Sequence, residues 1–227
     1  MKRLRAIAFV FFAIAFFAGR GLAAPATLGK LDITPAAFGR LPWVVFDERS
    51  GLPQHTIVDL QTDARGFVWA ATQDGPARYN GHEWETTPLP RSMRSNYARV
   101  MRLSKRGGLW IGSFDGGLAY LQPDGKWLTY GPRDGLPSNR IRGLLETPDG
   151  KTLWIATDGG VARLENGKFR TYGEGSGLPN LDTEALCLVH DEDGAVRLMV
   201  GTSQGMARLV GERFEPVPVP VAVPLRG

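Results

Sequence analysis

Apolar and polar residues alternate over short runs along most of the chain, and the runs are rich in β-branched and aromatic residues. Alternation with a period of two is typical of β-strands. In one clear segment the runs cover residues 141–146, 152–157, 161–164 and 168–172, separated by "TPDGK", "TDGG" and "ENGK". Asp-Gly and Asn-Gly pairs accept the positive backbone angles of tight hairpins. This segment therefore predicts four short antiparallel strands.

The same order of runs and turns occurs four times. "FVWAATQDG" at Phe67, "LWIGSFDGG" at Leu109 and "LWIATDGG" at Leu153 are close copies, and "LMVGTSQG" at Leu198 is a weaker one. Four antiparallel strands in a repeat of about 40 to 45 residues are typical of a propeller blade. The sequence therefore predicts an all-β fold, a β-propeller of four-stranded antiparallel blades, with blades at residues 55–88, 96–130, 139–172 and 182–217.

Large aromatic residues recur at fixed places in these repeats. The positions are Trp69, Trp110 and Trp154 in the second strand, with Met199 in the fourth copy, and Trp84, Trp127, Phe169 and Phe214 near the fourth strand. Recurrence at one blade position favours packing between neighbouring blades over carbohydrate-stacking platforms. The single cysteine, Cys187, lies in the apolar run "EALCLVH" and is expected to be a small buried residue.

The repeats leave one strand over. Residues 43–47, in "WVVFDERSGLP", align with the outer strands of the later repeats, although no earlier strands precede them. Residues 43–217 thus predict four blades plus one outer strand, an incomplete propeller whose ends do not meet, with a Pro/Val-rich tail at 218–227. Closure into a four-bladed ring remains the alternative. Open terminal blades expose apolar faces, so self-association is expected.

The first 26 residues have the pattern of a secretory signal peptide. Basic residues near Lys2 are followed by the apolar run Ala6–Ala18 and then by small residues. The run is shorter than the about 20 residues that span a bilayer. Residues 27–42 then form an N-terminal segment before the repeats. The sequence predicts a periplasmic or secreted bacterial protein.

Export also changes the electrostatic picture. The whole chain has 27 basic and 23 acidic residues, a net charge of +4. Lys2, Arg3, Arg5 and Arg20 all lie in the signal, so the mature chain is close to neutral. A nucleic-acid partner is not expected, because such proteins keep a clustered basic excess. The basic stretch Arg91–Arg106 is interpreted as a solvated face.

The motifs "LWIGSFDGGL", "LWIATDGGV" and "DGLPSNRI" resemble the two-component regulator propeller repeat over about residues 43–217. The chain departs from that pattern at Pro76, at Met199 and in the second repeat, where "RSMRSN" stands in place of a GLP loop. The resemblance implies a periplasmic sensor region, usually of seven-bladed propellers. In that family a β-sandwich, a transmembrane helix and a histidine kinase or diguanylate cyclase follow, and contact with the membrane is through those C-terminal parts.

No catalytic or metal constellation is expected. The histidines His55, His82 and His190 are scattered, and His55 and His82 are placed on opposite rims of the propeller. A zinc pattern needs more cysteine and histidine than the chain has. No G-x-S-x-G motif is present, and no helix follows the glycine-rich turns to bind phosphate. The chain is predicted not to be an enzyme and to use no cofactor.

A binding site is expected on the rim where the loops between blades meet the loops between second and third strands. These loops carry Gln54, His55, Gln73, Asp74, Asn96, Phe114, Asp115, Asn139, Arg140, Asp158, Asn180, Asp182, Ser203 and Gln204. The amide-rich set favours a neutral polyol, an oligosaccharide or a small peptide over a strong anion. The alternative for each residue is an ordinary role in local turn bonding.

Three function classes follow from these observations. The first is a ligand-sensing module of a signal-transduction receptor, as the N-terminal part of a longer two-component-type sensor. The second is a secreted propeller enzyme, a lyase or a glycoside-acting protein, which requires a histidine beside a carboxylate or metal on one rim. The third is a protein-interaction scaffold. The sequence favours the first.

Overall fold

The computed structural model of the chain describes residues 45–191 and 194–218. The described residues belong to the unit Val45–Gly227. The expected signal peptide at 1–26 and the segment at 27–42 lie outside the described residues, as does the tail beyond Pro218.

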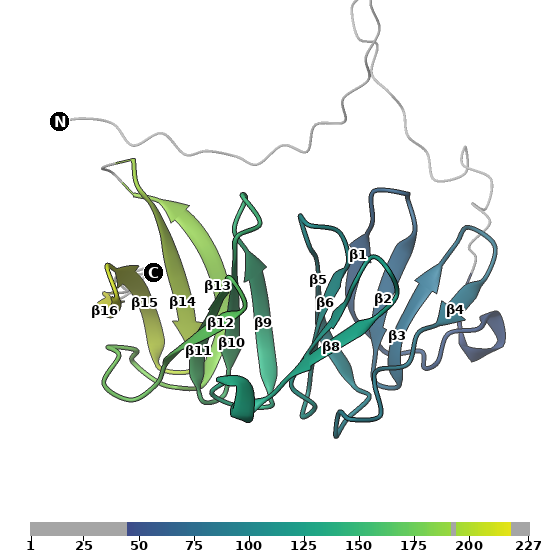
Figure 1. Cartoon of the computed structure of the whole chain (residues 1–227), viewed down its shortest axis with the longest axis horizontal. Helices are drawn as coiled ribbons and strands as arrows, with labels where there is room; N and C mark the ends of the chain where they lie inside the picture. Colours follow the sequence, from purple (N-terminus) through teal and green to yellow (C-terminus); the bar gives the residue numbers. More distant parts are fainter. Residues whose placement is uncertain (1–44, 192–193, 219–227) are drawn as a thin grey trace, which may run out of the picture. The chain divides into compact units, whose positions relative to one another are not determined.

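Within the described residues, four antiparallel sheets of four strands each follow one another along the chain (Figure 1). The first blade contains β1 (Ile57–Thr62), β2 (Val68–Thr72), β3 (Gly75–Tyr79) and β4 (Trp84–Thr86). The second contains β5 (Ala98–Leu103), β6 (Leu109–Ser113), β7 (Leu118–Leu121) and β8 (Trp127–Tyr130). Each sheet keeps the chain order of its strands, so every blade is a simple meander.

The other two blades repeat this plan. The third contains β9 (Ile141–Glu146), β10 (Thr152–Thr157), β11 (Gly160–Glu165) and β12 (Lys168–Tyr172). The fourth contains β13 (Thr183–His190), β14 (Val196–Thr202), β15 (Gly205–Val210) and β16 (Arg213–Val217). Two short 3-10 turns, η1 (Glu48–Ser50) and η2 (Pro132–Asp134), lie in the connections before the first and third blades. The all-β propeller prediction is confirmed, and the four strands predicted in the third repeat are present.

The first strands of successive blades are neighbours. Strand β1 contacts β5, β5 contacts β9, and β9 contacts β13. Each of these strands carries one register irregularity against its partner near the start of the strand. A bulge of this kind bends a strand and re-aims its side chains. Side chains from different repeats are thereby brought together along these first strands.

The core consists of apolar layers between successive blades. Trp69 packs with the second blade, Trp110 with the third and Trp154 with the fourth. All three tryptophans are buried, as expected for an interblade layer. The leucine of the GLP loop adds to a layer: Leu136 packs between the second and third blades.

The second repeat keeps this leucine in a different loop. Leu89, from the segment "PLP", is buried between the first and second blades, in the layer that corresponds to that of Leu136. The sequence shows no GLP loop in this repeat, because proline stands in place of the glycine. The second repeat thus keeps the buried leucine of the GLP motif, which packs between blades, but not its glycine.

The segment expected to be an outer strand, 43–47, is different in the structure. Val45–Asp47 form no strand, and Trp43 lies outside the described residues. Phe46 packs instead against Tyr79 and Trp84 of the first blade, with ring centroids 5.0 and 5.8 Å away. The Asp47 carboxylate accepts a hydrogen bond from the Arg49 amide at 2.9 Å and so starts η1. The aligned outer strand β8 is also followed by a 3-10 turn, η2, but β8 pairs with β7, whereas no strand of the described structure pairs with residues 45–47.

The expectation that Cys187 is buried is wrong, because its side chain is exposed. Cys187 lies opposite Met199 in the β13–β14 pair. The corresponding residue of the third blade, Leu145, lies opposite Trp154 and packs against the fourth blade. Among the described residues, no further blade covers the fourth in this way.

Candidate ligand-binding rim and inner groove

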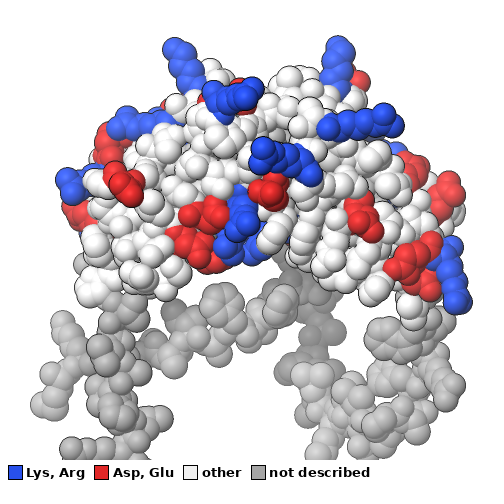
Figure 2. Space-filling view, turned by 90° about the horizontal axis from the view of Figure 1, so that it is seen from below, with Lys and Arg blue, Asp and Glu red and all other residues white. Residues whose placement is uncertain are grey.

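Loops between blades and loops between second and third strands meet at one edge of the sheets. The Asn96 side chain donates to the carbonyl of Asp74, the Gly117 amide donates to the carbonyl of Asn139 at 2.9 Å, and the Ser203 amide donates to that of Asp182 at 3.0 Å. We call this edge the loop rim. Figure 2 looks onto the edge at which η2 lies in Figure 1, and acidic and basic side chains alternate over it.

Several of the predicted rim residues hold their own turns. Gln54 bonds both the amide and the hydroxyl of Thr56, and Asn180 accepts from the Asp182 amide at 2.7 Å. Asn96 also accepts from the Leu89 amide at 3.0 Å. Gln54 and Asn180 thus serve the local backbone, which is the alternative expected for each residue, whereas Asn96 joins its own loop to the carbonyl of Asp74 in the preceding blade.

The remaining polar loop residues stand in solvent or partly so. Gln73, Ser203 and Gln204 are exposed, and Asp115 is half-buried. No hydrogen bond from the side chain of any of these residues appears in the described part of the structure. They are accessible but do not converge on a common atom.

Three predicted residues do come together around an aromatic pair. Phe114 stacks on Tyr97 with ring centroids 5.3 Å apart and an interplanar angle of 16°. The Arg140 guanidinium lies 5.7 Å from the Phe114 ring centre and pairs with Asp158 at 3.6 Å. Phe114 remains 39% exposed. This aromatic pair with its arginine is the part of the loop rim best shaped to contact a ligand.

The histidine of the rim has a structural partner. His55 Nδ1 lies 2.7 Å from Glu48 Oε1, and the His55 amide donates to the same oxygen at 3.1 Å. The side-chain hydrogen bond with His55 lowers the pKa of the Glu48 carboxyl below its ordinary value. Both groups are exposed and tie η1 to the start of the first blade.

Neither a metal site nor a membrane-spanning helix appears in the described residues. Within 45–191 and 194–218, no three His, Cys, Asp or Glu side chains are grouped so as to hold a metal ion. The same residues contain no helix with the length and apolar character needed to cross a bilayer.

A hollow that sequence analysis did not identify lies along the first strands. It has a volume of about 530 Å³ and is lined by Val58, Asp59, Tyr97, Arg99, Val100, Arg102 and Arg142. We call it the inner groove. Its residues come from β1, β5 and β9 and from Tyr97 just before β5. The sequence places Arg99 and Arg102 on a solvated face; in the structure β1 and β9 lie on either side of β5, and the two arginines line the inner groove.

Two of the charged side chains that line the inner groove, Arg142 and Asp59, are held by partners in the fold. Arg142 pairs with Asp182 at 3.2 Å and with Glu184 at 2.9 Å. Asp59 accepts from the backbone amides of Leu60 and Met101. Its carboxylate is thus held by the backbone of two neighbouring blades.

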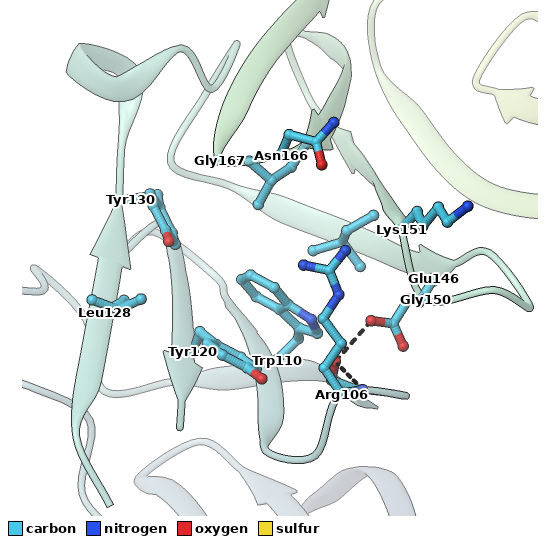
Figure 3. A pocket seen from close by; sticks show the side chains of 13 residues that line it. Arg106, Trp110, Tyr120, Leu128, Tyr130, Glu146, Gly150, Lys151, Asn166 and Gly167 are labelled. Atoms are coloured by element: carbon cyan, nitrogen blue, oxygen red, sulfur yellow. Dashed lines mark hydrogen bonds between the residues drawn. The ribbon is translucent and has the colours of Figure 1, made fainter. Parts of the chain in front are cut away.

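A second set of hollows lies in the seams between blades. Figure 3 shows the hollow between the second and third blades, where Tyr120 lies along Trp110 and Glu146 comes from the adjoining blade. The Trp110 and Tyr120 rings are 4.1 Å apart. The equivalent seams place Arg78 across from Trp69 and Arg163 across from Trp154. Each seam is therefore a repeated packing feature of the blades.

Comparison with known sequences supports the resemblance read from the motifs. Residues 135–159 match the family described as Two component regulator propeller. The match spans the GLP loop, β9 and β10 of the third repeat. This part of the third repeat is therefore similar to the two-component regulator propeller repeat. No curated protein matches the chain significantly.

Solved structures show the same fold. The extracellular domain of BT3049 of B. thetaiotaomicron, described as a hybrid two component system, is 24% identical with a TM-score of 0.58, over 71% of this chain and 23% of that one. The extracellular domain of BT4673 from the same organism, described as a one component system, is 18% identical with a TM-score of 0.60, over 74% and 25%. PorZ of Porphyromonas gingivalis, described as a bacterial surface component of the type-IX secretion system, is 13% identical with a TM-score of 0.51, over 74% and 28%. This chain spans about a quarter of the length of these structures.

Proposed function

We propose that this chain is a ligand-sensing β-propeller module of a bacterial signal-transduction receptor, acting in the periplasm or outside the cell. The observation that carries the proposal is the joint presence of the regulator propeller repeat and the exposed Phe114–Tyr97 pair on the loop rim. The signal-like residues 1–26 and the extracellular origin of the similar domains support the location. The module contributes binding, and no catalytic step is assigned to it.

The ligand of this module is a small molecule such as an oligosaccharide or a peptide. Phe114 is 39% exposed, and Arg140 with Asp158 supplies charged hydrogen-bonding groups beside it. Sites of this type combine a flat apolar surface with a few polar groups that fix orientation. Change in the receptor then follows from the greater affinity of the ligand for one of its states.

The proposal is tested by thermal unfolding of the exported protein with a panel of neutral oligosaccharides, tripeptides and sugar acids. A ligand that binds the folded state at 100 times its Kd stabilises it by about 2.7 kcal/mol. We expect at least one class to raise Tm, and Phe114→Ala to abolish that increase. Leu128→Ala is the matched control, because Leu128 is similarly exposed but lies on the outer strand β8. A panel without any binder, or an increase that Phe114→Ala leaves intact, contradicts the proposal.

A further inference from the structure

Two arginines of the inner groove have hydrogen-bond donors that the fold does not use. The nearest carboxylate to Arg99 is Glu184 at 3.9 Å, which is beyond hydrogen-bond distance. Arg102 donates from Nε and Nη2 to the Leu144 carbonyl, at 3.3 and 3.1 Å. A guanidinium has five N–H donors, so most of the donors of these two residues remain free for another partner.

The nearby carboxylates are shared or already engaged: Glu184 forms an ion pair with Arg99 through Oε2 at 3.9 Å, too long for a hydrogen bond, so the N–H donors of Arg99 stay unbonded in the described structure. Glu184 and Asp182 both pair with Arg142. The Asp59 carboxylate accepts backbone amides through both of its oxygens. Three guanidinium groups and one carboxylate thus line the inner groove, and that carboxylate makes no ion pair in the described structure. The free donors of Arg99 and Arg102 face a space that favours a negatively charged group.

An aromatic surface borders the same space. Tyr97 lines the inner groove and is stacked on Phe114 of the loop rim. The Arg99 guanidinium lies 5.9 Å from the Phe114 ring centre, so the aromatic pair and the arginine belong to one continuous surface. A ligand with both a flat apolar face and an oxyanion could place its apolar face against the aromatic pair and its oxyanion against the arginine.

We propose that the inner groove binds a small organic anion through Arg99 and Arg102, with the ring of Tyr97 against the body of the ligand. The oxyanion is a carboxylate or another group of the same hydrogen-bonding capacity. This inference rests on the proposed function, because it names the ligand class of that module. It replaces the sequence-based preference for a neutral ligand, since the groove's arginines were not recognised there.

The test compares ligands that differ in charge alone as far as possible. Glucuronate and glucose share a ring, and only the former carries a carboxylate; inorganic phosphate provides an oxyanion without a ring. Calorimetric titration of the exported protein is expected to show glucuronate binding at least about tenfold more tightly than glucose. Binding should weaken as sodium chloride is raised, because the groove is open to solvent.

Substitutions then assign the binding to these arginines. Arg99→Gln and Arg102→Gln are each expected to weaken glucuronate binding by about tenfold or more. Arg99→Gln removes no hydrogen bond of the fold, so it keeps the test decisive if Arg102→Gln proves unstable. Arg213→Gln, on the exposed outer strand β16, is the control and should leave binding unchanged.

The outcomes separate this inference from the function on which it rests. Phosphate binding that the same two substitutions weaken also supports the site and shows that the oxyanion alone suffices. Equal binding of glucose and glucuronate, or glucuronate binding that neither substitution weakens, overturns the anion site while the sensing function stands. Absence of binding by both glucuronate and phosphate also overturns the anion site. Binding of a neutral ligand that depends on Phe114 would in that case support the proposed sensing function without the anion site.

Discussion

A threonine at the end of the second strand closes the next hairpin in three of the four repeats. The hydroxyls of Thr72, Thr157 and Thr202 donate to the carbonyls of the glycines that begin the third strands, at 2.7, 2.7 and 2.8 Å. The third repeat extends this arrangement to the next blade. Thr183 Oγ1 accepts from the Thr157 amide at 2.9 Å and donates to the Thr157 carbonyl at 2.7 Å. Both threonines are fully buried, so water cannot replace either partner.

Removing the Thr183 hydroxyl should therefore destabilise the protein. Thr183→Val keeps the side-chain shape but leaves the buried Thr157 amide without its acceptor, at a cost of about 1–3 kcal/mol in the free energy of unfolding. Urea denaturation measures the loss. Thr171→Val is the control, because the Thr171 hydroxyl also donates to a carbonyl, that of Gly135, but is exposed. Equal losses for the two variants would show that the bond between blades contributes no more than an exposed one.

At the scale of the element, the sequence predicts those strands whose ends are determined by residues close to them in the chain. The strands β9, β10 and β12 begin and end where the alternation and the Asp-Gly and Asn-Gly turns placed them, because strand ends here are set by the local backbone. Residues 43–47 align with outer strands, but a strand also needs a partner, and no strand of the described structure pairs with residues 45–47. The inner groove was missed for a different reason. Its lining residues come from three repeats and its arginines from two, and spacing within one repeat does not show which side chains face one another.

The tryptophan of the second strand should be the most costly residue of a blade to remove. Trp154 is buried against the fourth blade, where it packs with Leu198 and Val200. Trp154→Ala is expected to lower the free energy of unfolding by about 3–5 kcal/mol, as for other large aromatics removed from a core. Asp158→Ala, four residues further on, removes an ion pair with the exposed Arg140 and should cost less than about 1 kcal/mol. Similar losses in chemical denaturation would mean that Trp154 does not carry the layer between these blades.

At the scale of the whole molecule, the repeat predicts the blades. It does not predict whether the outer faces of the first and fourth blades are buried, because burial depends on what packs against them. Met101 and Leu144 occupy one blade position, opposite Ile111 and Ile155, and both are buried under the preceding blade. The same position in the first blade, Leu60, is 55% exposed. On the other side of a blade, Val161 is fully buried, whereas its counterpart Met206 in the fourth blade is 40% exposed.

These two exposed faces are the two halves of an interface that the molecule already forms three times. The face of Leu60 corresponds to surfaces that pack onto a preceding blade, and the face of Met206 to surfaces that receive a following one. We propose that a second copy of this chain packs its first blade onto the fourth blade of its neighbour. Such head-to-tail contact is heterologous, so it leads either to a closed ring or to longer assemblies.

We expect sedimentation velocity to show association that grows with protein concentration. The double variant Leu60→Asp and Met206→Asp should remain monomeric, because each contact would bury one carboxylate opposite another. Leu128→Asp is the matched control: Leu128 is 41% exposed but lies on the outer strand of the second blade, so its substitution should leave association intact. A monomer at all concentrations, or association that the double variant does not reduce, would show that these faces do not pair between copies. Loss of association in both variants would instead assign it to general surface hydrophobicity, because the Leu128 side chain lies on neither terminal face.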